Sequence, residues 1–357
     1  MMNNNAEVKV SLKEKISSAY KSFVEDWKDP VKRKVRGKNT LITAGKLIRG
    51  LILIGLCFII LLPIIEKLSA ALRHPSDISN PQVVFVPAKV SLVNFHISWE
   101  LLGIWDLNAK TFALTSSLLN TVLVSTFCMV LQVMSAAVAG YSFARLKFKG
   151  NNIVFYLVIF TLVVPNETLH VSRVLFLTNN SFFGINLMST MFSMYILAAF
   201  GQGIRSAIFI YLFRQFFKNL PKELEESAQV DGAGVIRTFW SVMLPNARGA
   251  VVTVGLFSFV WQWNDYYFAN LLKYSVSYPL LSTKLGGNTE RLDTVLSTWK
   301  AAGKEVLEGV EDIAQDPMFR GLIANTAALL MMAPLLIGYF FVQKLFVESI
   351  ERTGIVG

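Results

Sequence analysis

The sequence is poor in charged residues and in the residue types that build disulfides, metal sites and catalytic centres. Only 16% of its 357 residues are charged and 53% are hydrophobic, which is too apolar for a soluble globular protein of this length. Its two cysteines, Cys57 and Cys128, lie inside apolar runs, which favours two small buried residues over a disulfide. The three histidines lack ligand spacing, and no metal site is expected. The chain is therefore predicted to be an integral membrane protein.

Motifs of nucleotide binding and covalent catalysis are also missing. No Gly-rich phosphate loop, nucleophile constellation or dinucleotide fingerprint occurs in the sequence. We therefore expect no catalytic residue, no enzymatic activity and no cofactor in this chain. The net charge of +10 would suggest a nucleic-acid partner in a soluble chain, but 12 of the 34 Lys and Arg lie in the first 49 residues. Membrane topology explains that bias better, and no nucleic-acid partner is expected.

Six apolar segments are long enough to span a bilayer, whose hydrocarbon core of about 30 Å takes about 20 helical residues. They predict an all-α fold of six transmembrane helices, at residues 47–65, 112–143, 153–177, 185–213, 250–272 and 322–342. An even number of spans puts both termini on one side of the membrane. That side carries 22 Lys and Arg against 11 on the other, which predicts that both termini are cytoplasmic.

This topology divides the chain into three parts. Residues 1–46 form a basic cytoplasmic segment, interpreted as a helix on the anionic membrane surface or a disordered tail. Residues 47–343 form the transmembrane domain, and residues 344–357 form a cytoplasmic tail. The domain has extracellular loops at about 66–111 and 273–321 and a cytoplasmic loop at 214–248. An amphipathic segment at about 286–320 is interpreted as surface packing or as a contact with an extracellular partner.

The polar segment 219–245, which we call the hook, lies between two apolar runs and predicts two short helices joined by a turn. Pro221 and a group of glutamates suit the start of a helix, where negative charge meets the positive end of the dipole. Gly232 is expected to end that first helix. Such a pair of helices can lie at the membrane surface and present one face to a partner.

The spacing of residues in the hook resembles that of the cytoplasmic loop in permease subunits of ATP-binding-cassette importers. Glu226-Ser227-Ala228, Gly232, Val242 and Leu244-Pro245 keep every spacing of that pattern, with Ser in place of an Ala and Val in place of an Ile. The flanking residues are similar to the carbohydrate branch, of the type of the second maltose permease subunit. The resemblance covers roughly residues 107–357.

The resemblance implies a type I importer fold in a bacterial cell membrane and a set of partners within the lipid bilayer and beside it. These are a homologous second permease subunit, two ATPase subunits that bind ATP and Mg²⁺, and an extracellular solute-binding protein. The expected solute is a carbohydrate, delivered as an oligosaccharide. Two alternatives stay open: a non-sugar solute, and an ion-coupled secondary transporter, although few acidic residues lie in the spans.

Three groups of candidate site residues follow. Contact with the ATPase is expected at Glu225, Glu226, Ser227, Ala228, Asp231, Gly232, Ala233, Leu244 and Pro245. A substrate path, or alternatively interface and packing, is expected at Trp261, Trp263, Asn264, Asp265 and Tyr266. A bend or break in the fourth span, or alternatively a helix that runs into the cytoplasm, is expected at Gly201, Gly203 and Arg205.

Overall fold

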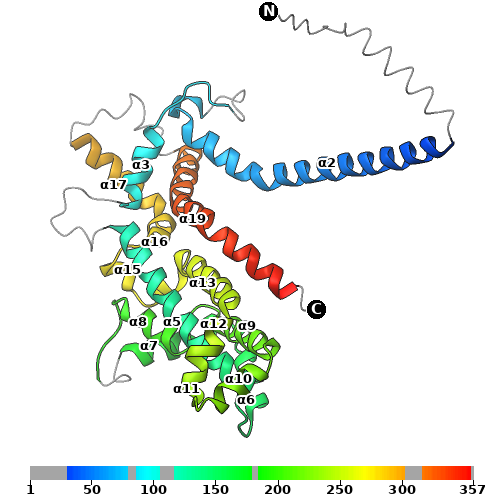
Figure 1. Ribbon diagram of the computed structural model, residues 1–357. Coiled ribbons are helices and arrows are strands. Elements are labelled where there is room, and N and C mark those ends of the chain that lie inside the picture. The colour runs from blue at the N-terminus through cyan, green and yellow to red at the C-terminus, as the bar shows by residue number, and fades with distance from the viewer. Residues whose placement is uncertain (1–29, 79–85, 105–115, 179–183, 302–315, 355–357) are drawn as a thin grey trace, which may run out of the picture. The chain divides into compact units, whose positions relative to one another are not determined.

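The computed structural model describes residues 30–78, 86–104, 116–178, 184–301 and 316–354, and these are helical apart from their connections (Figure 1). Within these ranges the structure has no strand, only one isolated antiparallel bridge between Arg73 and Val90. The all-α prediction is confirmed. Of the predicted basic N-terminal segment, residues 1–29 lie outside the described residues, and residues 30–46 belong to the first long helix of the structure.

The chain divides into a first unit that ends at Glu66 and a second that begins at Lys67. The described part of the first unit belongs to α2 (Pro30–Leu72). From Lys38 this helix is long and apolar enough to cross a membrane. Its large apolar side chains between Leu47 and Leu61 are exposed, as expected of a helix that meets lipid.

The second unit is built around α5 (Ser117–Arg145), which packs along α9 (Ser206–Asn219) and α13 (Arg248–Trp263). Helix α13 also packs against α19 (Pro317–Gly354), which in turn packs against α3 (Val93–Leu102). Figure 1 shows α5 and α13 running side by side. Small residues on α5, such as Ala136, Ala137 and Gly140, are buried and allow the neighbouring helices to approach closely.

The third and fourth predicted spans are not continuous helices, which corrects the prediction. Segment 153–177 divides into α6 (Asn151–Phe160), η2 (Asn166–Leu169) and α7 (His170–Thr178). Pro165 explains this division because a proline disfavours helical backbone at the preceding residue. Segment 185–213 divides into α8 (Phe192–Ala199) and α9.

The fifth predicted span is also shorter than expected. Helix α13 ends at Trp263, and a separate short helix, α14 (Tyr267–Leu271), follows. Within the described residues, three helices are long and apolar enough to cross a membrane, namely α2, α5 and α19. A fourth span results if the helices at Val235–Asn246 and α13, which are bent by 79°, are counted together. The number six therefore stays a prediction.

The second predicted outer loop contains α15 (Tyr274–Ser277), α16 (Leu281–Gly286) and α17 (Asn288–Ala301). Helix α17 lies in the amphipathic insertion and buries Leu292, Leu296 and Trp299 in the same cluster as Ile97 and Leu101 of α3. The indole of Trp299 also donates a hydrogen bond to Glu100. The described part of the insertion therefore packs on its own chain, whereas the apolar positions from 306 to 313 lie outside the described residues.

The predicted cytoplasmic tail, 344–357, is continuous with the last span. Helix α19 runs through it as far as Gly354, and the final three residues lie outside the described ranges. The helix also begins at Pro317, earlier than the predicted residue 322. Proline suits a first helical turn because its missing N–H would be unpaired there.

Candidate functional site

The hook folds as short helical segments joined by a tight turn. Helix α10 (Glu223–Val230) is followed by α11 (Val235–Thr238), a π-helical turn labelled η3 (Phe239–Met243), and α12 (Leu244–Asn246). Gly232 adopts a φ of 78°, in the left-handed region that suits glycine. The N–H of Ala233 donates to the carbonyl of Ala228 at 2.9 Å, as in a helix C-cap.

One face of the hook is attached to α5 through Glu225. The hydroxyl of Tyr141 donates to Oε1 of Glu225 at 2.8 Å, and Nε of Arg145 lies 3.5 Å from Oε2. Arg145 also donates to the carbonyl of Leu220 at the start of the hook. We call Tyr141, Arg145 and Glu225 the Glu225 junction. Its ion pair is largely buried, with side chains that are 7% and 14% exposed.

The same inner face includes Ala228, which is buried against the chain itself. The sequence grouped Glu225 and Ala228 with the ATPase contact, but the structure turns both towards their own chain. The physical reason is that Tyr141 packs on the hook, with its ring centroid 5.3 Å from that of Phe239. Ala233 and Leu244 are half-buried.

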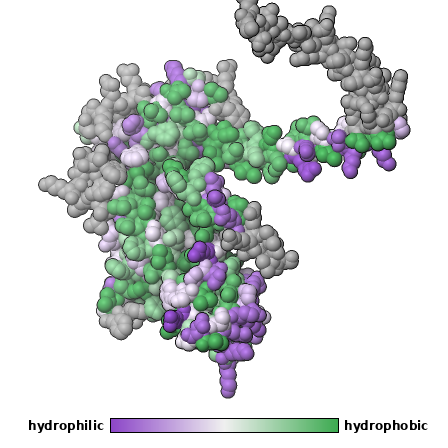
Figure 2. Space-filling model, viewed as in Figure 1, coloured by the Kyte–Doolittle hydropathy of each residue, from purple (hydrophilic) through white to green (hydrophobic). Residues whose placement is uncertain are grey.

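The other face of the hook is exposed and mixes acidic and apolar side chains. Val230 is 87% exposed and Ile236 is 76% exposed, and Val235 and Trp240 are also exposed. Around them lie further predicted residues that are exposed, namely Glu226, Ser227, Asp231, Gly232 and Pro245. Figure 2 shows hydrophilic side chains gathered over the end of the second unit where α6 and α10 lie. Exposed apolar residues on such a polar end are typical of a binding surface.

We call Val230, Val235, Ile236 and Trp240 the apolar patch of the hook. The sequence contained the signal for it, because these four apolar residues occur in a polar segment. Helical periodicity accounts for Val235, Ile236 and Trp240 equally well, so the sequence alone does not assign them to an exposed face. No comparable signal identified Tyr141 and Arg145, which belong to an ordinary apolar span.

The second predicted motif, at the end of α13, is mostly buried. Trp263 is 1% exposed, and its indole N–H donates to the carbonyl of Met331 on α19 at 3.2 Å. Asp265 is 6% exposed and accepts hydrogen bonds from the N–H of Phe268 at 3.0 Å and the hydroxyl of Tyr274 at 3.1 Å. These contacts favour the packing interpretation for both residues.

The remaining residues of this motif differ from one another. Asn264 is exposed, and its amide donates to the carbonyl of Val260 in its own helix. Tyr266 is half exposed. Trp261 stacks on Phe209 with ring centroids 5.2 Å apart, and the guanidinium of Arg205 lies 4.8 Å from its ring. Of the five residues of this motif, only Asn264 and Tyr266 are exposed.

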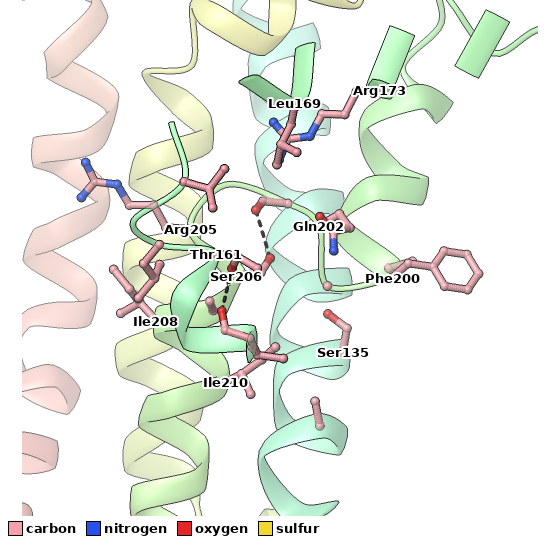
Figure 3. A pocket seen from close by; sticks show the side chains of 18 of the residues that line it. Ser135, Thr161, Leu169, Arg173, Phe200, Gln202, Arg205, Ser206, Ile208 and Ile210 are labelled. Carbon is pink, nitrogen blue, oxygen red and sulfur yellow. Dashed lines mark hydrogen bonds between the residues drawn. The ribbon is translucent and has the colours of Figure 1, made fainter. Parts of the chain in front are cut away.

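The fourth predicted span is interrupted between Ala199 and Ser206. Gly201 has a φ of 71° and Arg205 a φ of 52°, both in the left-handed region. Backbone outside a helix is tolerated at membrane depth where protein covers it or where it lines a cavity. Here the interruption lines a cavity of about 880 Å³ (Figure 3). Other walls come from α5, at Ser135 and Val138 among others, and from the interruption of the third span, residues 161–165.

The fold and these surfaces define a polytopic helical membrane protein with interrupted spans, a cavity beside them and an exposed hook. The chain belongs to the family described as the inner membrane component of binding-protein-dependent transport systems, whose model matches residues 132–352. The match includes the hook, the interruption between α8 and α9, and residues 261–266 at the end of α13. The chain is thus a transport component of the membrane, as the resemblance of its sequence implied.

Relatives with known names are similar over most of their length. The melibiose/raffinose/stachyose import permease protein MelC of Bacillus subtilis is 24% identical over 302 residues, which cover 83% of this chain and 91% of the relative. The sn-glycerol-3-phosphate transport system permease protein UgpE of Yersinia pestis is 26% identical over 244 residues, or 68% and 80% of the two chains.

A solved structure shares the fold. It is a chain of a bacterial ABC transporter involved in the import of the acidic polysaccharide alginate, with a TM-score of 0.62 and 19% sequence identity. The alignment covers 85% of this chain and 97% of that one. The expected type I importer fold is therefore confirmed.

Proposed function

We propose that this chain is one of two homologous permease subunits of an ATP-driven importer and forms half of the translocation path for a carbohydrate. Family membership supports a binding-protein-dependent transporter over an ion-coupled one. The names of the relatives support the solute class, since MelC is named for three oligosaccharides and the structural neighbour for alginate. An extracellular solute-binding protein delivers the solute, and both termini and the hook face the cytoplasm.

The hook docks on one of two ATPase subunits, which bind ATP and Mg²⁺ themselves, so that this chain needs no cofactor. The observation that carries this proposal is the apolar patch. Val230 and Ile236 are largely exposed on either side of the turn at Gly232, and Trp240, which is 48% exposed, is of a residue type enriched among those that carry binding energy at interfaces. Glu226, Ser227 and Asp231 form a polar rim around the patch.

A paired substitution tests the docking. Ile236→Asp puts a charge into the proposed interface, while Val276→Asp makes the equivalent change at a residue of α15 that is 80% exposed and distant in sequence from the hook. Both variants are expressed with the partner subunits and purified through a tag on this chain. We expect Ile236→Asp to lose the ATPase and Val276→Asp to retain it. Retention in both would contradict the docking site.

The cavity beside the interrupted helices is proposed as part of the translocation path. Its volume of about 880 Å³ is in the range of sites for small organic ligands, and it is lined by hydroxyl, amide and backbone groups as well as apolar side chains. Uptake of radiolabelled oligosaccharides, acidic oligosaccharides and glycerol phosphate by vesicles that contain the complex tests the solute class. Uptake of glycerol phosphate alone would favour the non-sugar alternative, which the name of UgpE supports.

A further inference from the structure

The buried side-chain amide of Gln132 on α5 forms hydrogen bonds to the start of α9 and to α13. The Nε2 of Gln132 donates to the carbonyl of Ile204 at 3.0 Å and to the hydroxyl of Ser206 at 3.1 Å. Its Oε1 accepts a hydrogen bond from the hydroxyl of Ser258 on α13. Gln132 is 1% exposed, so these partners replace all contact with water. We call Gln132, Ile204, Ser206 and Ser258 the Gln132 junction.

The junction lies where the fourth span is interrupted and where the cavity forms. Ser206 begins α9 and Ile204 belongs to the interruption, so Gln132 fixes the near end of α9. One helical turn further along α5, the hydroxyl of Ser135 donates to the carbonyl of Ala198 at 3.0 Å and so fixes the end of α8. Figure 3 labels Ser206 and Ser135 among the residues that line the cavity.

The interrupted backbone packs closely against the Gln132 side chain at Gly203. A Cβ atom added to Gly203 would collide with the amide of Gln132. Polar groups buried in a membrane domain have a high cost unless they are paired, so the junction is stable only in geometries that keep its hydrogen bonds. It therefore favours a small number of discrete positions of α9 relative to α5 and α13.

The far end of α9 leads directly into the hook. Helix α9 ends at Asn219, and Arg145 at the end of α5 donates to the carbonyl of the next residue, Leu220. Between the two ends, α5 and α9 are in close contact, because a Cβ added to Gly140 would lie 2.5 Å from Cβ of Phe213 and 2.9 Å from N of Arg214. A force on the hook is thus carried to the interruption by two helices that cannot slide freely.

From this geometry we infer that Gln132 is a positioning residue of the transport cycle, which couples displacement of the hook to the shape of the cavity. The hook, α9 and the end of α5 move together because the Glu225 junction joins them. Nine residues of α5 separate Tyr141 from Gln132, about 14 Å of helix. At the Gln132 junction, the displacement changes the position of Ile204 and Ser206, which lie beside the cavity. This inference rests on the proposed docking of the hook on the ATPase.

The test replaces the amide with an apolar side chain of similar length and shape. Gln132→Met is compared with Gln343→Met, where the amide on α19 donates to the carbonyl of Phe340 in its own helix. Each chain carries a reporter thiol, Thr161→Cys, at an exposed residue of the cavity, in a Cys57→Ser background that removes the exposed native thiol. Complexes in lipid vesicles are assayed for uptake per ATP hydrolysed and for labelling by a water-soluble maleimide, with and without a non-hydrolysable ATP analogue.

We expect Gln132→Met to assemble and hydrolyse ATP while uptake per ATP falls about fivefold or more, the usual lower range of coupling between two sites. The change in labelling caused by the ATP analogue should be lost as well. Gln343→Met should retain both properties. Gly203→Ala, which displaces the Gln132 amide from the other side, should give the same result, and the double variant should be no worse than either single one.

The outcomes separate the inference from the function on which it rests. A labelling change that persists in Gln132→Met with normal uptake would overturn the role of Gln132 while leaving the hook's role intact. Absence of any labelling change in the parent chain would contradict the coupling role of the hook itself. If Gln132→Met and Gly203→Ala both fail to assemble and Ser258→Ala transports normally, Gln132 serves folding alone and the inference is wrong.

Discussion

The hook and the end of α13 are two motifs of similar composition that the fold uses in opposite ways. Each contains tryptophan, at least one acidic residue and apolar residues in a short run. In the hook, Trp240 is 48% exposed and Ile236 is 76% exposed. In the α13 motif, Trp263 and Asp265 are buried and hydrogen-bonded within the chain. The comparison shows that composition marks both motifs as unusual. Only their burial shows that one is a surface for a partner and the other is a packing contact between helices.

The largest effect is expected from a substitution that removes the buried contact between α13 and α19. Trp263→Ala removes a fully buried indole between α13 and α19 and should lower the free energy of unfolding by about 3–5 kcal/mol. Trp240→Ala makes the same change on the hook and should leave unfolding nearly unchanged while weakening binding of the ATPase. Thermal unfolding of the purified subunit in detergent measures the first effect and co-purification the second. Equal destabilisation by both substitutions would contradict the comparison.

A smaller effect is expected at Asp265. Asp265→Ala leaves the hydroxyl of Tyr274 and the N–H of Phe268 without an acceptor in a buried site, at about 1–3 kcal/mol for each donor. Asp265→Asn keeps an acceptor oxygen and should cost less. Glu226→Ala is the control on the exposed face of the hook. If Asp265→Asn changed the preference among sugars without loss of stability, direct contact with the substrate would be supported over packing.

Valine substitutions at Gly232 and Gly234 test whether the turn of the hook is needed for ATPase binding. Gly232→Val must place a β-branched residue at a φ of 78°, at a local cost of about 1–2 kcal/mol, whereas Gly234 has a φ of −72° that any residue adopts. No atom lies near an added Cβ at either position. We expect Gly232→Val to weaken ATPase binding and transport and Gly234→Val to change them less. Normal transport by Gly232→Val would argue against the hook as the coupling element.

The smallest effect is expected at the C-terminus. Deletion of residues 351–357 removes the end of α19 and the last three residues of the chain, which we expect to contact the ATPase pair. Because the described part is the final turn of a long helix, stability should not change. A modest fall in complex yield or in ATPase regulation is expected, and unchanged values for both would exclude a role for the tail.

The sequence by itself determined the class of the protein, the family and the local backbone of the hook. Low charge and long apolar runs allow only a membrane chain, and the turn at Gly232 depends on a left-handed conformation that a single residue type adopts easily. The two glycines before Arg205 indicated the position of the interruption because glycine is a weak helix former, and Gly201 adopts a φ of 71° there. Pro165 likewise indicated an interruption of the third predicted span. The length and hydropathy of segment 153–177 favoured one continuous helix instead.

The tertiary structure alone decided which faces are covered. Glu225 and Glu226 are adjacent acids on one helix, about 100° apart around its axis, and nothing in their local sequence distinguishes them. Tyr141 and Arg145, more than 75 residues away, pair with the first, while the second is exposed. Likewise, Asp265 is buried because Tyr274 folds back onto it. Helical periodicity determines which residues share a face, but the covering of that face depends on long-range packing, which no short window of sequence contains.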